Sequence, residues 1–315
     1  MENVKQTEKK KKFKKVGAKG QWHWMGIAGF TYLCLWVAFL YFRLGWAFVK
    51  SIQDMSDFLL SGSSATAWPN KFSFAAYAKV LTVIKFDIRG YDGSVHTAYM
   101  FEMTLNAIIF SLINTFVNLI VTMCVAYVTA RHDFWFNKVL VGFFYFQMLV
   151  PIIGTMSSSL KILKNLHLFD TWLGFVIQRF NFFGGLYFLI YRDMFKKLAD
   201  SYADAAKIDG AGNWQVMIQI CFPLVKSIFM MGAMTGLISS WNNYSAPLLY
   251  LPSHPTVSYG LFIFNNAKSG GDNAEFAYMP YKLAGFMLLL LPTTLFYLLF
   301  KEKMLGATST GGLKE

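Results

Sequence analysis

Amide, hydroxyl and aromatic side chains recur inside the apolar runs of this chain, where they could bind a polar solute. Unpaired polar groups are costly in hydrocarbon and usually face protein or a watery cavity. Amides hydrogen-bond hydroxyl groups, and aromatic rings pack on the C–H faces of sugar rings, so this set suits a neutral sugar. For any single asparagine, the alternative is that its amide joins two helices. The candidate pathway residues are Asn114, Asn118, Gln147, Arg179, Ser239, Trp241, Asn242, Asn243 and Tyr244.

Arg179 differs from the other candidates because it carries a charge. It lies eight residues into an apolar run at 171–191, which at about 1.5 Å per residue puts it roughly 12 Å deep in a membrane span. A buried arginine needs an anionic or carbonyl partner. Our hypothesis is that Arg179 faces a cavity and favours an acidic or highly hydroxylated glycan. The alternative is that it snorkels or pairs within the protein.

The histidines and cysteines form no catalytic or metal-binding pattern. The five histidines are scattered, with no HExxH spacing, and Cys34, Cys124 and Cys221 are too far apart for a disulfide framework or a thiolate site. No nucleophile and base stand out together. We therefore predict a protein that is not an enzyme and has no metal site, with cysteines that act as small apolar residues.

Composition predicts an all-helical integral membrane protein. Of the 315 residues 55% are apolar and only 15% are charged. Runs of about 20 apolar residues, the length that a helix needs to cross a bilayer, predict six spans. They lie at 26–49, 104–130, 139–160, 171–191, 227–249 and 280–300.

The distribution of basic residues predicts how the chain is oriented in the membrane. The first twenty residues hold eight lysines and two glutamates, and so supply half of the formal charge of +12. Because this run at 1–25 lies beside a span, it indicates a topology signal that also contacts anionic lipid, not nucleic-acid binding. Segment 50–103 on the other side is balanced in charge. Both termini, including the tail at 301–315, are therefore expected in the cytoplasm.

One predicted cytoplasmic loop, within 193–226, is charged and broken by glycine. Its centre reads SYADAAKIDGAGNWQVMIQICFPLVK, from 201 to 226. Apolar spacing predicts a helix from Phe195 to Asp209 that Gly210 and Gly212 stop. Asn213 is expected to cap a second helix, which ends before Pro223. Short helices of this kind are marginal alone, so the unit needs a docking partner.

This loop resembles the "EAA" coupling loop of permease subunits of bacterial ATP-binding-cassette importers, in particular the maltose-permease-like carbohydrate branch. The match runs through "DAAKIDGAGNWQVMIQICFP", with Asp204 where the family usually has glutamate. The segments "WPNKFSFAAYAKVL" and "WNNYSAPLLYL" and the short tail are similar to the second permease of such pairs. Segment 85–103 looks like an insertion. The resemblance assigns coupling to Tyr202, Asp204, Ala205, Ala206, Asp209, Gly210, Ala211, Trp214, Ile220 and Pro223.

The resemblance implies a type I importer permease fold, with a permease core at 104–300, and a role in ATP-driven uptake of a sugar or oligosaccharide. It implies three partners: a second permease, a cytoplasmic ATPase dimer and an extracytoplasmic binding protein. No GxxxxGK[ST] loop is present, so ATP and magnesium are expected only in the ATPase. The alternatives are an importer of a non-sugar solute and a six-span secondary transporter, although the latter would not call for a coupling loop.

Overall fold

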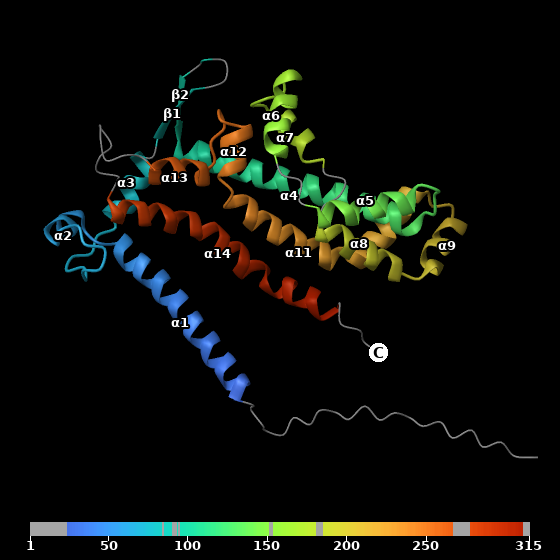
Figure 1. The fold of residues 1–315 in the computed structure, drawn as a ribbon, viewed down its shortest axis with the longest axis horizontal. Coiled ribbons are helices and arrows are strands. Elements are labelled where there is room, and N and C mark those ends of the chain that lie inside the picture. The colour runs from blue at the N-terminus through green and yellow to red at the C-terminus, as the bar shows by residue number, and fades with distance from the viewer. Residues whose placement is uncertain are drawn as a thin grey trace, which may run out of the picture. The chain divides into compact units, whose positions relative to one another are not determined.

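A computed structural model describes residues 24–83, 85–89, 93, 95–150, 154–180, 185–266 and 278–310, without the side chains of 25, 83, 86, 89 and 303–310. Most of these residues are helical, as predicted, and Figure 1 labels the elements along the chain. The chain divides into two compact units between Ala47 and Phe48. The predicted basic tail at 1–25 lies almost wholly outside the described residues.

Helix α1 (Trp24–Ser51) supplies the described part of the first unit and continues into the second. Its segment Gly26–Ser51 is long and apolar enough to cross a membrane, slightly longer than the predicted 26–49. Its described side chains are exposed from Trp24 to Leu44. A helix that is apolar on all sides needs lipid or protein around it.

A buried polar network fixes the segment after α1. The Lys50 side chain is 0% exposed, and its Nζ donates to Gln53 Oε1 at 2.9 Å and to the Ser64 carbonyl at 3.1 Å. Gln53 Nε2 donates to Asp57 Oδ2 at 2.8 Å, and the Asn70 backbone N–H donates to the same oxygen at 3.0 Å. The network ties α1 to α2 (Met55–Leu60) and to the loop that leads to α3 (Ala75–Val83).

The predicted insertion at 85–103 forms a hairpin and the first turn of a helix. Strands β1 (Lys85–Arg89) and β2 (Val95–Tyr99) pair antiparallel, with Lys85 opposite Tyr99, and are the exception to an all-helical chain. Ile88 and Ala98 are buried in a cluster with residues of α3 and α13 (Val257–Asn266). Because α4 begins at Met100, residues 100–103 belong to the second span, which was predicted to start at 104.

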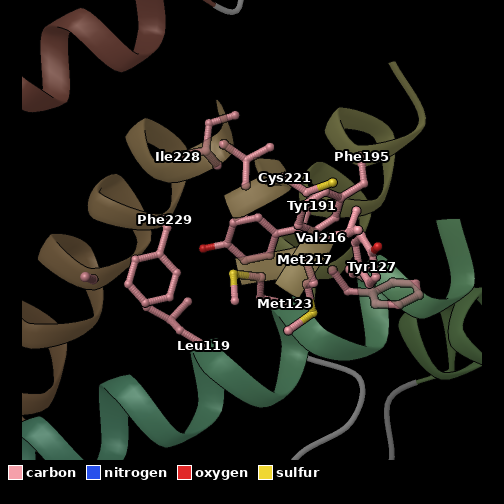
Figure 2. Packing of buried hydrophobic residues seen from close by; sticks show 14 of the residues in the cluster. Leu119, Met123, Tyr127, Tyr191, Phe195, Val216, Met217, Cys221, Ile228 and Phe229 are labelled. Carbon is pink, nitrogen blue, oxygen red and sulfur yellow. The ribbon is translucent and has the colours of Figure 1, made fainter. Parts of the chain in front are cut away.

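Three helices form the centre of the second unit: α4 (Met100–Arg131), α8 (Leu186–Lys197) and α11 (Phe222–Trp241). Figure 2 shows the Tyr191 ring of α8 among Met123 of α4, Met217 of the π-helical turn η1 (Val216–Cys221) and Phe229 of α11. All four side chains are buried. Helix α14 (Met279–Thr310) packs along α11 and also contacts α3 and α13.

A stripe of small residues at four-residue spacing, Gly232, Gly236 and Ser240, lets α11 approach α4 closely. A Cβ added to Gly236 would lie 2.7 Å from Thr115 Cγ2, and one added to Gly232 would lie 3.1 Å from Leu119 Cδ2. Further along the stripe, Ser240 lies 3.2 Å from the Thr115 hydroxyl.

Four of the predicted spans are helices long and apolar enough to cross a membrane, but those at 139–160 and 171–191 are each broken in two. The first comprises α5 (Asn137–Leu149) and α6 (Thr155–Asn165). Pro151 disfavours helix at Val150, whose backbone is extended, and Gly154 has φ of 87°. The second comprises α7 (Trp172–Gln178) and α8, and Gly185 before α8 has φ of 62°.

The fifth span is longer at its start and shorter at its end than the predicted 227–249. Backbone helix runs from α10 (Asn213–Gln215) through the π-helical η1 (Val216–Cys221) into α11, so the expected end before Pro223 is wrong. Pro223 comes directly after η1, where the π-helical turn already interrupts the regular i to i−4 hydrogen bonds, so its missing N–H is tolerated inside the helical run. Beyond Trp241, Asn243 starts a new helix, α12 (Ser245–Tyr250), by accepting from the Ala246 N–H.

The coupling loop has the predicted helix, glycine turn and helix, with different boundaries. The first helix, α9 (Asp200–Ile208), is separate from α8 because Leu198 and Ala199 are extended. Gly210 has φ of 87°, a conformation that favours glycine. Asn213 does not cap the second helix, because Gly212 holds that position and its N–H donates to Gln215 Oε1. Helix α14 continues to Thr310, into the predicted tail.

The α4–α11 contact predicts opposite effects for the same substitution at two glycines. Gly236→Ala forces a methyl group against Thr115 and should destabilise the protein by about 1–3 kcal/mol. Gly142→Ala, where nothing lies within 4 Å, should stabilise α5 by up to about 1 kcal/mol. Thermal unfolding in detergent measures both, and equal changes would contradict this account of the contact.

The network around Asp57 predicts a loss of stability in acid. Hydrogen bonds from the Gln53 side chain and the Asn70 backbone hold the pKa of Asp57 below its ordinary value. Because this pKa is lower in the folded state, the stabilisation is complete above the unfolded value of about 3.9 and is lost as the pH falls below it. Proteolysis of segment 52–74 should therefore accelerate as the pH falls below about 4. Asp57→Asn should accelerate proteolysis at neutral pH. It should also make the proteolysis rate depend less on pH in the acid range.

Candidate functional site

A polar cavity of about 200 Å³ lies beside the α4–α11 contact. Two of its walls are α4 and α11, and the others are the end of α7 and the start of α8. Its lining residues are Asn114, Thr115, Asn118, Leu119, Arg179, Tyr187, Gly232, Gly236, Ser239 and Ser240. The lining combines amides, hydroxyls, one guanidinium and one aromatic ring, so it can hydrogen-bond a hydroxylated ligand.

A chain of hydrogen bonds joins three elements across this cavity. Arg179 Nη1 donates to Asn114 Oδ1 at 3.1 Å, and Asn114 Nδ2 donates to Ser240 Oγ at 2.7 Å. Arg179 Nη2 donates to Gln178 Oε1 at 3.0 Å, and its guanidinium lies over the Phe175 ring, 5.0 Å from the centroid. Asn114 therefore holds both the arginine of α7 and the serine of α11.

The structure gathers four of the predicted pathway residues at the cavity: Asn114, Asn118, Arg179 and Ser239. It does not bring Gln147 there, because that side chain is exposed on α5. The remaining four lie at the end of the fifth span, outside the lining: Trp241, Asn242, Asn243 and Tyr244.

Those four side chains have local contacts instead. The Trp241 indole N–H donates to the Leu289 carbonyl of α14, and Asn242 Nδ2 donates to the Ile238 carbonyl of its own helix. Asn243 caps α12, and Tyr244 stacks on Phe262 with centroids 4.2 Å apart. Helical spacing placed Asn242 and Asn243 with Ser239, but α11 ends before their side chains could share its face.

The predicted pathway residues omit four polar residues of this site: Thr115, Tyr187 and Ser240, which line the cavity, and Gln178, which lies beside Arg179. The Tyr187 hydroxyl lies 2.6 Å from Thr235 Oγ1, and Tyr187 lines the cavity. Gln178 accepts from Arg179. A glutamine next to an intramembrane arginine was a usable signal, whereas Tyr187 depends on the break before α8, which hydropathy does not register.

A second candidate site is the exposed surface of α9 and α10, on the coupling loop. Large apolar side chains there face outward, including Tyr202 (55% exposed), Ile208 (86%) and Trp214 (67%). Of the other residues that the resemblance assigns to coupling, five are exposed and two are half-buried. The exposed ones are Asp204, Ala205, Asp209, Gly210 and Pro223, and the half-buried ones are Ala211 and Ile220. Ala206 is buried in the core cluster. Exposed apolar groups on a polar segment are typical of a protein-binding surface.

The coupling loop is anchored to the core at two points. Ala206 of α9 packs with Val216, Met217 and Cys221 of η1 in the core cluster. Asp200, the first residue of α9, accepts from Arg131 Nη1 at the end of α4. Its position is therefore set by α4, the helix that also supplies Asn114 to the cavity.

The described residues contain no group of three histidine, cysteine, aspartate or glutamate side chains that could hold a metal ion. The three cysteines are free thiols, and Cys34 is exposed on α1.

Curated relatives of the chain are transport permeases. It is 24% identical over 266 residues to the arabinooligosaccharides transport system permease protein AraQ of Bacillus subtilis, covering 84% of this chain and 87% of that protein. It is 27% identical over 217 residues to the maltodextrin transport system permease protein MalD of Streptococcus pneumoniae, covering 67% of this chain and 74% of that protein.

The fold matches a solved transporter. One chain in the crystal structure of a bacterial ABC transporter involved in the import of the acidic polysaccharide alginate superposes with a TM-score of 0.68 at 20% identity. The match covers 88% of this chain and 95% of that one. It supports the type I importer permease fold.

The family model for the inner membrane component of binding-protein-dependent transport systems matches residues 122–305, which include the cavity helix α11 and the whole coupling loop. Since this match covers more than half of the chain, the protein belongs to the family of binding-protein-dependent transport system inner membrane components, multi-pass permeases of ABC transporters that are not themselves enzymes.

Proposed function

We propose that this chain is one of two permease subunits in an ATP-driven importer of a sugar or oligosaccharide. AraQ and MalD, the relatives named above, are permeases for oligosaccharides. The amides and hydroxyls of the α4–α11 cavity suit the same ligand chemistry. We assign Asn114, Asn118, Arg179 and Ser239 to the translocation pathway.

The observation that carries the proposal is the exposed helix–glycine–helix unit that continues into a cavity helix. Trp214 of α10 and Ser239 of α11 lie on one unbroken helical segment, Asn213–Trp241. At roughly 1.5 Å per residue this segment is about 40 Å long, enough to reach from one face of a membrane into its interior. A movement of the exposed unit would thus reach the cavity without passing through a flexible loop.

The partners follow from this arrangement. In the proposal the exposed side chains of α9 and α10 dock on a cytoplasmic ATPase dimer, which supplies ATP and magnesium. A second permease completes the pathway, and an extracytoplasmic binding protein delivers the sugar. Both termini of this chain are cytoplasmic, so the β1–β2 hairpin faces the binding protein.

Coupling can be tested by two substitutions in the exposed unit. Asp204→Lys reverses an exposed charge on α9, and Gly210→Pro is incompatible with a φ of 87°. Each should abolish the substrate-stimulated ATPase activity of the complete importer while the subunit remains in the membrane. Asp133→Lys is the matched control, because it reverses an exposed charge between α4 and α5, on the same predicted side of the membrane but outside the coupling loop. Normal stimulation in both coupling variants would refute the proposed docking site.

The substrate class is tested on the binding protein that delivers to this permease. A thermal-shift screen of mono- and oligosaccharides, amino acids and short peptides should show stabilisation by a saccharide. Stabilisation only by a non-sugar solute would contradict the carbohydrate assignment and leave the coupling result intact.

A further inference from the structure

The Arg179 guanidinium lines the cavity with its charge uncompensated by the described chain. Its Nη1 and Nη2 donate to the neutral amide oxygens of Asn114 and Gln178, and its Nε is buried without a partner. Among the residues that the structure describes, no carboxylate forms an ion pair with it. By contrast, Arg131, at the end of α4, pairs with Asp200.

The position of this guanidinium is fixed from three sides. Asn114 cannot turn away freely, because its Nδ2 donates to Ser240 Oγ at 2.7 Å. Gln178 holds the second terminal nitrogen, and the Phe175 ring lies beneath the guanidinium plane. Phe175 is itself buried and stacks on Phe110, with centroids 4.8 Å apart. The cation is therefore held in place before any ligand arrives, which lowers the entropic cost of binding.

A fixed cation inside a membrane span is costly unless an anion accompanies it. Neutral amide oxygens satisfy hydrogen bonds but do not balance the charge. The cavity surfaces beside the guanidinium are neutral as well, with Asn118, Ser239 and Tyr187. A ligand that combines an oxyanion with hydroxyl groups would balance the charge of the guanidinium. Its hydroxyl groups would form hydrogen bonds with the neutral side chains of the lining. Guanidinium donors match carboxylate and phosphate oxygens in particular.

We propose that Arg179 is the specificity-determining residue of this permease and that it selects saccharides bearing an oxyanion, a uronic acid carboxylate or a phosphate ester. The inference rests on the proposed function and narrows its substrate class. The oxyanion binds the part of the Arg179 guanidinium that lines the cavity, and the sugar hydroxyls bind Asn118 and Ser239. Asn114 and Gln178 are positioning residues that keep the guanidinium directed into the cavity.

The test uses the complete importer in proteoliposomes, with its binding protein at saturating concentration. The probes are a galactose disaccharide, the matching galacturonic acid disaccharide and glucose 6-phosphate. We expect wild-type uptake to favour an acidic probe, and the two acidic probes distinguish a carboxylate from a phosphate ligand. Arg179→Gln should lower the ratio of acidic to neutral uptake by about tenfold to a hundredfold, as expected when a charged hydrogen bond is lost. Arg179→Lys should retain part of this preference.

A second variant tests the charge without removing the arginine. Asn114→Asp keeps the shape of the side chain and places a carboxylate 3.1 Å from Arg179 Nη1, at the position of the present amide oxygen. It should lower the acidic-to-neutral ratio as much as Arg179→Gln, because the cation would then have an internal partner. Lys161→Gln, on the exposed face of α6, removes a positive charge away from the cavity and should leave the ratio unchanged.

The outcomes separate this inference from the proposed function. Saccharide uptake that favours the neutral probe, or that keeps its acidic preference in both cavity variants, overturns the role of Arg179 and leaves the sugar importer standing. If Arg179→Gln fails to insert, the Asn114→Asp ratio decides alone. An importer that accumulates no saccharide probe and takes up a non-sugar solute contradicts the proposed function itself.

Discussion

The close approach of α4 and α11 is the constraint on which the rest of the structure depends. It is possible because Gly232 and Gly236 have no side chains to separate α11 from Leu119 and Thr115 of α4. The hydrogen bond from Asn114 to Ser240 forms across this contact, between residues 126 positions apart in the sequence. On one side of the contact lies the buried cluster around Tyr191, and on the other lies the polar cavity. A larger distance between α4 and α11 would weaken the packing of the buried cluster and would also separate the residues that line the cavity.

The two arginines tied to α4 show how differently a buried cation can be held. Arg131 pairs with the exposed carboxylate of Asp200 and so fixes the start of the coupling loop. Arg179 contacts only neutral amides within the described chain. Removing Asp200 would expose a charge to water at the end of a helix, where solvation is available. Arg179 is half-buried and lines the cavity, so a partner for its charge can reach it through the cavity.

Much of the fold follows from the sequence because apolar length and small-residue spacing are local properties. The spans at α1, α4, α11 and α14 and the stripe through Gly236 were predictable on these grounds. The breaks before Gly154 and Gly185 were not, since hydropathy measures the transfer of side chains and does not register backbone angles. The predicted helix end before Pro223 was wrong for a related reason: the π-helical turn before this proline interrupts the regular hydrogen bonds, and hydropathy does not register such a turn.

The candidate site was less predictable than the fold, and its residues show why. Asn114, Asn118 and Ser239 were identified because polar groups are conspicuous in an apolar run. Which of these groups face a cavity depends on contacts between helices far apart in the chain. Asn243, like Asn114, is an asparagine inside a predicted apolar span, yet its side chain caps α12. Tyr187 is not conspicuous in the sequence, because it is one aromatic residue in an apolar run. It lines the cavity only because α7 and α8 are separate helices.

The π-helical turn η1 links the two halves of the proposed mechanism. Val216, Met217 and Cys221 are buried against α4 and α8, so η1 cannot hinge without repacking the core. Tightly packed cores shift between discrete arrangements more readily than they deform continuously. A partner that moves α9 and α10 would therefore move η1, α4 and α11 together, and not bend a loop between them. Since α4 and α11 form two walls of the cavity and Arg179 at the end of α7 forms another, its opening would change when this packed body moves against α7 or against a second subunit. Coupling between the exposed helices α9 and α10 and the cavity helix α11 needs a rigid connection, and the buried residues of η1 provide it.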